Sequence, residues 1–194
     1  MEPAGLNYLY TLNNMKDRYH QDAHKIVCLL FVQPNKTLVQ TEILSNLGYA
    51  NMRSGSDIDF FFVGYSASKT CDPDEVTIQA HSGVNWYYIP IMFVKFVNEI
   101  EKQSTWKYSG ETELFITEFA HEKLCYNKVI SIWLDRAVHE ELIYSVSNLF
   151  EDIYRVVQNK KESSVLKPMR DFIDKTFRGT IKSSAIYAIK NYSK

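Results

Sequence analysis

Residues 25–33 read KIVCLLFVQ, and residues 58–64 read IDFFFVG. Short, continuously apolar runs of this kind are typical of strands covered on both faces of a sheet. Residues 37–47, between the two runs, carry apolar side chains at helical spacing and are followed by Gly48, a common helix stop. The order of strand, helix and strand predicts an α/β unit with a right-handed parallel crossover.

The rest of the chain extends this unit. An amphipathic helix over 5–20 precedes it, and Pro90 suits the first position of a later helix. The further elements expected, in chain order, are short strands over 76–79 and 86–89, a helix over 90–103, paired strands over 113–117 and 128–134, and a long helix over 137–158 capped by Asp135.

These elements predict a three-layer α/β fold, with a mixed, mostly parallel sheet flanked by helices. Residues 1–159 are expected to form a single α/β domain, because 194 residues suit one domain better than two. Residues 160–194 are expected to form a basic helical tail, with short helices over 168–177 and 183–189, packed on the domain or extending from it.

Composition excludes several classes of protein. A chain with 45% hydrophobic and 14% aromatic residues has the apolar surface that disordered chains lack. No run approaches the roughly 18 apolar residues that span a bilayer, and the N-terminus has no signal-peptide pattern. We therefore expect a cytoplasmic protein without membrane contact. Three widely spaced cysteines and five histidines show no disulfide or metal-ligand spacing, so no metal ligand set is assigned.

The charges are unevenly distributed. Residues 1–159 carry 13 basic and 20 acidic side chains, whereas residues 160–194 carry 9 basic and 3 acidic ones. A basic tail can contact nucleic acid or an acidic partner, and it can equally dock on its own acidic domain.

The densest polar cluster reads RSGSDID, from Arg53 to Asp59. Period-2 geometry puts Asp57 and Asp59 on one face of the strand start, where two carboxylates can hold Mg²⁺ for phosphoryl transfer. This G-S-D-I-D run resembles the corresponding strand of nucleotidyltransferases. That family also places Gly-Ser about ten residues upstream, and here Leu47-Gly48-Tyr49 lacks the serine. The alternative is a turn whose Ser and Asp side chains satisfy backbone donors.

A second cluster reads WKYSGETE, from Trp106 to Glu113. If the strands that follow the two clusters are neighbours, both serine-glycine-acid turns line one cleft. Aromatic rings there can stack a base, and a glutamate can act as an acid or base. The candidate catalytic residues are Asp57, Asp59, Glu111 and Glu113, and the candidate ligand-binding residues are Arg53, Ser54, Trp106, Tyr108 and Ser109. The alternative is two unrelated turns with solvent-facing glutamates.

The paired motifs R-S-G-x-x-I-D-F-F and W-K-Y-S-G-E-T-E-L also resemble those of small α/β proteins encoded in bacterial defence islands. This resemblance implies an anti-phage role beside a partner protein and carries over no catalytic residue. The first hypothesis is therefore a defence component that recognises or processes a nucleotide-like ligand in the shared cleft. The alternatives are a non-enzymatic subunit that binds a protein partner or forms a homo-oligomer, and a metal-dependent nucleotidyltransferase or nuclease using Asp57 and Asp59. The sequence leaves open whether the protein is an enzyme.

Overall fold

A computed structural model describes residues 2–3, 8–19, 25–46, 58–79, 85–158, 166–177 and 187–193. The strands are β1 (Glu2–Pro3), β2 (Lys25–Phe31), β3 (Ile58–Phe62), β4 (Tyr65–Ser66), β5 (Val76–Gln79), β6 (Asn85–Tyr88), β7 (Glu113–Ala120), β8 (Lys123–Trp133) and β9 (Tyr187–Lys190). The helices are α1 (Tyr8–Arg18), α3 (Pro90–Gln103), α4 (Leu134–His139), α5 (Val146–Gln158) and α6 (Leu166–Phe177), and two short helical turns are η1 (Val39–Ile43) and η2 (Leu44–Asn46).

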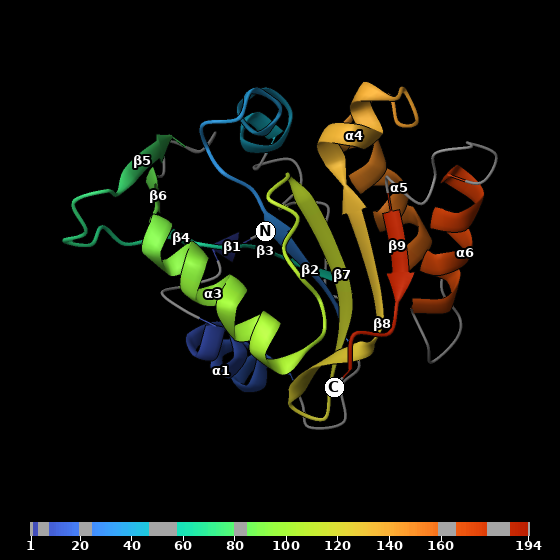
Figure 1. The fold of residues 1–194 in the computed structure, drawn as a ribbon, viewed down its shortest axis with the longest axis horizontal. Helices are drawn as coiled ribbons and strands as arrows, with labels where there is room; N and C mark the ends of the chain where they lie inside the picture. The colour runs from blue at the N-terminus through green and yellow to red at the C-terminus, as the bar shows by residue number, and fades with distance from the viewer. Residues whose placement is uncertain are drawn as a thin grey trace.

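The strands form a mixed central sheet and a smaller second sheet (Figure 1). The central order is β1-β3-β2-β7-β8-β9, and the second order is β4-β6-β5. Among the described strands of the central sheet, β1, β3 and β2 run parallel, whereas β7, β8 and β9 join in antiparallel pairs. The predicted α/β class with a mixed sheet is confirmed. The expected predominance of parallel pairing is wrong, because β7 and β8 form a hairpin that extends the sheet antiparallel to β2.

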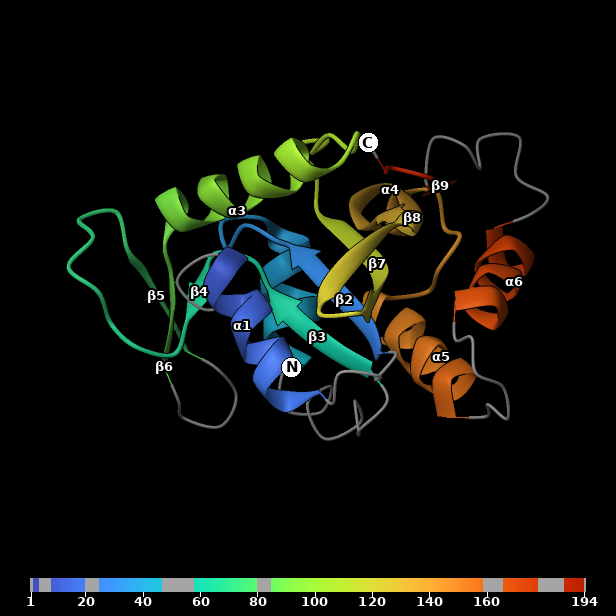
Figure 2. The same ribbon diagram turned by 90° about the horizontal axis from the view of Figure 1, so that it is seen from below.

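Helices lie on both faces of the central sheet (Figure 2). On one face α1 and α3 pack together, and the Tyr8 and Phe96 rings meet at 5.4 Å between centroids. On the other face α5 covers β3, where Phe60 stacks against Phe150 at 5.1 Å and Tyr154 at 5.4 Å. β2 lies between these layers with Ile26 to Phe31 wholly buried, as its uninterrupted apolar sequence predicts.

Three local predictions differ from the structure. The expected helix over 137–158 is divided into α4 and α5, and the residues between them are not helical. Asp135 lies in the first turn of α4 and does not cap α5. The expected helix over 183–189 is wrong for residues 187–189, which belong to β9.

β9 is held in place by its neighbour in the sheet. It pairs with β8 from Val129↔Lys190 to Ile132↔Tyr187, and backbone hydrogen bonds in this ladder outweigh the local preference for a helix. α6, by contrast, covers the helix expected over 168–177, begins slightly earlier at Leu166, and packs against α5.

In the part of the chain that the structure describes, no helix is long and apolar enough to cross a membrane.

Candidate functional site

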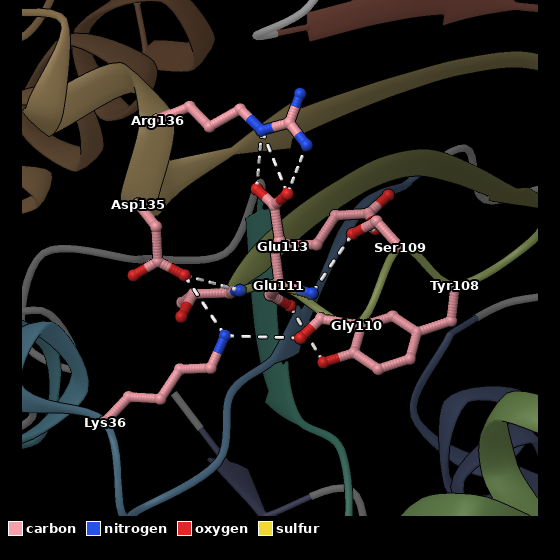
Figure 3. A network of polar contacts seen from close by, with 9 residues as sticks. Lys36, Tyr108, Ser109, Gly110, Glu111, Glu113, Asp135 and Arg136 are labelled. Atoms are coloured by element: carbon pink, nitrogen blue, oxygen red, sulfur yellow. Dashed lines mark hydrogen bonds and ion pairs between the residues drawn. The ribbon is translucent and has the colours of Figure 1, made fainter.

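The segment from Ser104 to Thr112 joins α3 to β7 and carries most of the described candidate residues. Tyr108 is held at both ends: its backbone N–H donates to Glu101 Oε1 at 3.0 Å, and its hydroxyl donates to the Glu111 carbonyl at 2.8 Å. Gly110 follows with a φ of 82°, a conformation that favours glycine. The turn is thus fixed in shape by its own hydrogen bonds (Figure 3).

Glu113 is almost completely buried, with 1% of its surface exposed. One carboxylate oxygen accepts a hydrogen bond from the Trp106 indole N–H at 2.9 Å, and the other accepts one from Ser109 Oγ at 3.2 Å. Burial raises the pKa of this carboxyl, and the hydrogen bonds only partly oppose the effect. Glu113 therefore lies beneath the turn and does not reach the surface.

Trp106 lies in the same buried cluster. It is 1% exposed, and its ring packs against Phe31 at 4.9 Å and Phe115 at 5.3 Å between centroids. The Trp106 ring therefore faces the core rather than an open cleft.

Glu111 is on the outer side of the turn and binds Arg136 of α4. Arg136 Nε lies 2.9 Å from each carboxylate oxygen, and the guanidinium makes a further contact through Nη2. This bidentate pairing raises the pKa of Arg136. The Glu111 carboxylate is thus engaged by a cation.

Asp135 and Lys36 connect the turn to the loop after β2. Asp135 Oδ2 accepts hydrogen bonds from the Thr112 N–H at 2.9 Å and from Lys36 Nζ at 3.2 Å. Lys36 also donates to the Gly110 carbonyl at 3.3 Å. Partial burial alone would raise the pKa of Asp135, but these hydrogen bonds outweigh it and the pKa is lowered. Through these hydrogen bonds, Lys36 and Asp135 connect the turn to the loop that follows β2 (Figure 3).

The first predicted cluster is only partly described. Arg53, Ser54 and Asp57 lie outside the described residues. Asp59 is the second residue of β3 and accepts a hydrogen bond from the hydroxyl of Tyr19, the residue that follows α1. Within the described ranges, no group of three or more His, Cys, Asp or Glu side chains is arranged to hold a metal ion.

The structure does not bring Asp59 and Glu113 together. β2 lies between β3 and β7, so the two strands are not neighbours. Asp59 is level with Val27 of β2, and Glu113 is level with Phe31. Four residues of a strand correspond to roughly 13 Å, and two strand spacings add roughly 10 Å across the sheet. Because β7 is antiparallel to β2, the two strands begin at opposite ends of the sheet.

The structure instead places a pocket beside Tyr108, at the carboxyl end of β2. It has a volume of about 500 Å³. We call it the aromatic pocket, and its lining residues are Gln33, Pro34, Asn35, Val76, Tyr88, Pro90, Phe93, Val94, Val97 and Tyr108. The Phe93 ring lies between two tyrosines, 6.0 Å from Tyr88 and 5.4 Å from Tyr108 between centroids.

The described lining of this pocket is apolar, aromatic and amide in character. Among its described residues there is no carboxylate, amine, imidazole or thiol. Burial raises the pKa of Tyr88 to about 12, and burial also raises that of Tyr108. Both hydroxyls therefore stay protonated at neutral pH, and neither acts there as a base.

Sequence reasoning identified only Tyr108 among the residues of the aromatic pocket. Tyr88 and Phe93 were assigned to a strand and to a buried helix face, and nothing in their spacing showed that they meet Tyr108. One signal was present: Pro34-Asn35 ends β2, and ligand sites of open α/β sheets lie outside the carboxyl ends of their strands.

Comparisons of the chain with protein-family models, with curated proteins and with solved structures find no match. Function is therefore inferred from the geometry of this site.

Proposed function

We propose that the protein is a binding module without catalytic activity of its own, whose aromatic pocket receives an apolar side chain of a partner protein. The observation that carries this proposal is the grouping of exposed apolar residues at the pocket. Among the described residues, four large hydrophobic side chains are exposed: Val76 (44%), Ile91 (49%), Val94 (53%) and Tyr144 (91%).

Two of these four side chains, those of Val76 and Val94, line the aromatic pocket. Ile91 lies about one turn before Val94 on the same side of α3. Scattered exposed hydrophobic residues are ordinary, but an exposed apolar group around a concave site is typical of an interaction surface. Aromatic rings such as those of Tyr88 and Tyr108 are also enriched where proteins bind one another.

A nucleotide-like ligand is the second candidate. Tyr108, which the sequence predicts to stack a base, favours this candidate because it lines the aromatic pocket. The pocket lies at the carboxyl end of a parallel strand and beside the first turn of α3, where α/β proteins often bind ligands. Among the described lining residues there is no cationic side chain, which argues for recognition of an uncharged ring rather than of phosphates. The placement of the protein in bacterial anti-phage defence remains a proposal, as do the three-layer description and the division into a domain over 1–159 and a basic tail over 160–194 that packs on it or extends from it.

The two candidates are distinguished by an NMR titration of the ¹⁵N-labelled full chain. One series uses N-acetyl-L-tryptophanamide as a minimal aromatic side chain, and the other uses adenosine. We expect the tryptophan derivative to shift the backbone amides of Tyr88, Val94 and Tyr108, and Val94→Asp to abolish the shifts.

Val94 is about half exposed, so this variant keeps its fold, and an unchanged melting temperature verifies it. Tyr144→Asp is the matched control, because it places the same charge at an exposed hydrophobic position that does not line the pocket. Shifts with adenosine alone would favour the second candidate. An absence of shifts in both series would contradict both.

A further inference from the structure

β5 is an edge strand that lies beside the aromatic pocket. In the order β4-β6-β5 it pairs only with β6 among the described strands. On the other edge of β5, no described strand pairs with the backbone N–H and C=O groups. Natural proteins often protect such an edge with lysine or proline, and VTIQ, residues 76–79, contains neither.

A groove runs along this edge. A second cavity, of about 370 Å³, is lined by Thr77, Ile78 and Gln79 of β5 and by Gln40, Leu44 and Ser45 of η1 and η2. It shares Pro34 with the aromatic pocket, which contains the first residue of β5, Val76. The two cavities therefore lie next to each other along β5, and together we call them the β5 groove. Its length follows that of β5, roughly 13 Å for four extended residues.

Three acidic residues lie in the loop that leads into β5. They are Asp72, Asp74 and Glu75, within four positions of Val76. Asp72 Oδ1 accepts the Asp74 N–H at 2.9 Å, and Glu75 Oε2 accepts Thr70 Oγ1 at 2.8 Å, so these carboxylates order their own loop. The ion pairs found among the described residues do not involve any of the three.

We infer that the β5 groove binds an extended segment of a partner protein, which adds a strand to the free edge of β5, inserts an aromatic side chain into the aromatic pocket and places a Lys or Arg against Asp72, Asp74 and Glu75. This inference rests on the proposed function and names its partner chemistry. Strand addition fits the groove because an extended backbone satisfies the groups that β5 leaves unpaired.

The positions of these features set the motif of the partner. The aromatic pocket and the acidic residues both lie at the Val76 end of β5, so the aromatic and basic residues of the partner are within about two positions of each other. A compact ligand would occupy only one of the two cavities, whereas a strand of four or five residues spans both.

The test begins with selection of random dodecapeptides on the immobilised full-length protein. We expect enrichment of peptides that carry an aromatic residue close to Lys or Arg within an alternating apolar pattern. The tightest peptide is then labelled, and its affinity is measured by fluorescence anisotropy for the wild type and the variants.

Two changes in the protein should each weaken binding for a different reason. Val94→Asp places a charge in the apolar lining of the pocket, which an inserted aromatic ring would have to desolvate, and we expect at least a tenfold loss. Asp74→Lys reverses one exposed charge and should cost about two- to fivefold, less at high salt. Asp17→Lys is its matched control, since it makes the same charge change at an exposed position of α1 and should leave the affinity unchanged.

N-methylation of the peptide, one amide at a time, tests the strand itself. Because alternate N–H groups of a paired strand point to its neighbour, methylation at every second position should reduce affinity about tenfold or more, and methylation between them should not. Uniform tolerance of methylation, with binding still lost in Val94→Asp, would overturn strand addition and leave the aromatic pocket as a binding site. Failure of the library to enrich any peptide would overturn the inference as a whole.

Discussion

Replacing Glu113 by glutamine should stabilise the protein, and by an amount that grows with pH. The carboxyl group is 1% exposed, and its burial raises its pKa in the folded chain. Because the pKa of Glu113 is higher in the folded chain than in the unfolded chain, protonation of this carboxyl stabilises the fold. This stabilisation is complete below the pKa of the unfolded chain, about 4.3, and is lost as the pH rises through the pKa of the folded chain. Glutamine stays neutral throughout, so the Glu113→Gln variant does not suffer this loss.

The magnitude follows from proton linkage. Every tenfold difference in proton affinity between the folded and unfolded chain changes the free energy of unfolding by about 1.4 kcal/mol. Glutamine keeps the hydrogen bonds because its carbonyl can accept the Trp106 N–H and its amide can donate to Ser109 Oγ. Near pH 4 the two proteins should therefore have similar free energies of unfolding, and the difference should increase above that pH and then level off.

Urea denaturation of the two proteins between pH 4 and pH 8.5 measures this difference. Glu113→Ala separates the charge from the hydrogen bonds: relative to Glu113→Gln, it leaves the buried Trp106 N–H without an acceptor, which should cost about 1–3 kcal/mol at every pH. Asp17→Asn, at an exposed position of α1, is the control for a general effect of net charge. The reasoning would be refuted by a Glu113→Gln difference that is constant with pH or that shrinks as pH rises.

Two further predictions concern the framework of the site. Gly64 and Gly110 have φ values of 80° and 82°, so alanine at either position adds about 1 kcal/mol of backbone strain. A Cβ at Gly64 would also lie 2.6 Å from Phe93 Cβ, whereas a Cβ at Gly110 would have no neighbour within 4 Å. Urea denaturation should show Gly64→Ala to be more destabilising than Gly110→Ala by about 1–3 kcal/mol, and equal losses would contradict the close packing of Phe93. Arg136→Ala breaks the Glu111 ion pair, whose side chains are 47% and 25% exposed, and should change the free energy of unfolding by less than about 1 kcal/mol. A loss of several kcal/mol in that variant would mean that the pair orders the whole turn.

Elements with a strong local signal were predictable from the sequence. α3 occupies Pro90–Gln103, as expected, because proline suits the first helical position and a regular apolar stripe faces the core. β2 and β3 follow from their uninterrupted apolar runs, and they pair in parallel as predicted.

The interruption between α4 and α5 could not be seen in the same way. The apolar stripe continues through Leu142, but there the chain turns: the Leu142 and Ile143 N–H groups both bond to the Ala137 carbonyl, and Glu141 has a φ of 55°. α5 then begins where Glu42 of η1 accepts the Val146 N–H at 2.7 Å. A residue more than a hundred positions away thus binds the first turn of this helix.

In the candidate site too, some features follow from the local sequence and others only from tertiary contacts. The sequence alone determined that the segment from Trp106 to Glu113 forms a polar turn before a strand, because serine, glycine and acidic residues satisfy the backbone locally. Only the tertiary structure decided that Glu113 is buried, that Glu111 binds Arg136, and that Tyr108 joins Tyr88 and Phe93 in a pocket. Local hydrogen bonds depend on neighbours in the sequence, whereas burial and the walls of a pocket depend on β2 lying between β3 and β7 and on β5 lying beside η1 and η2.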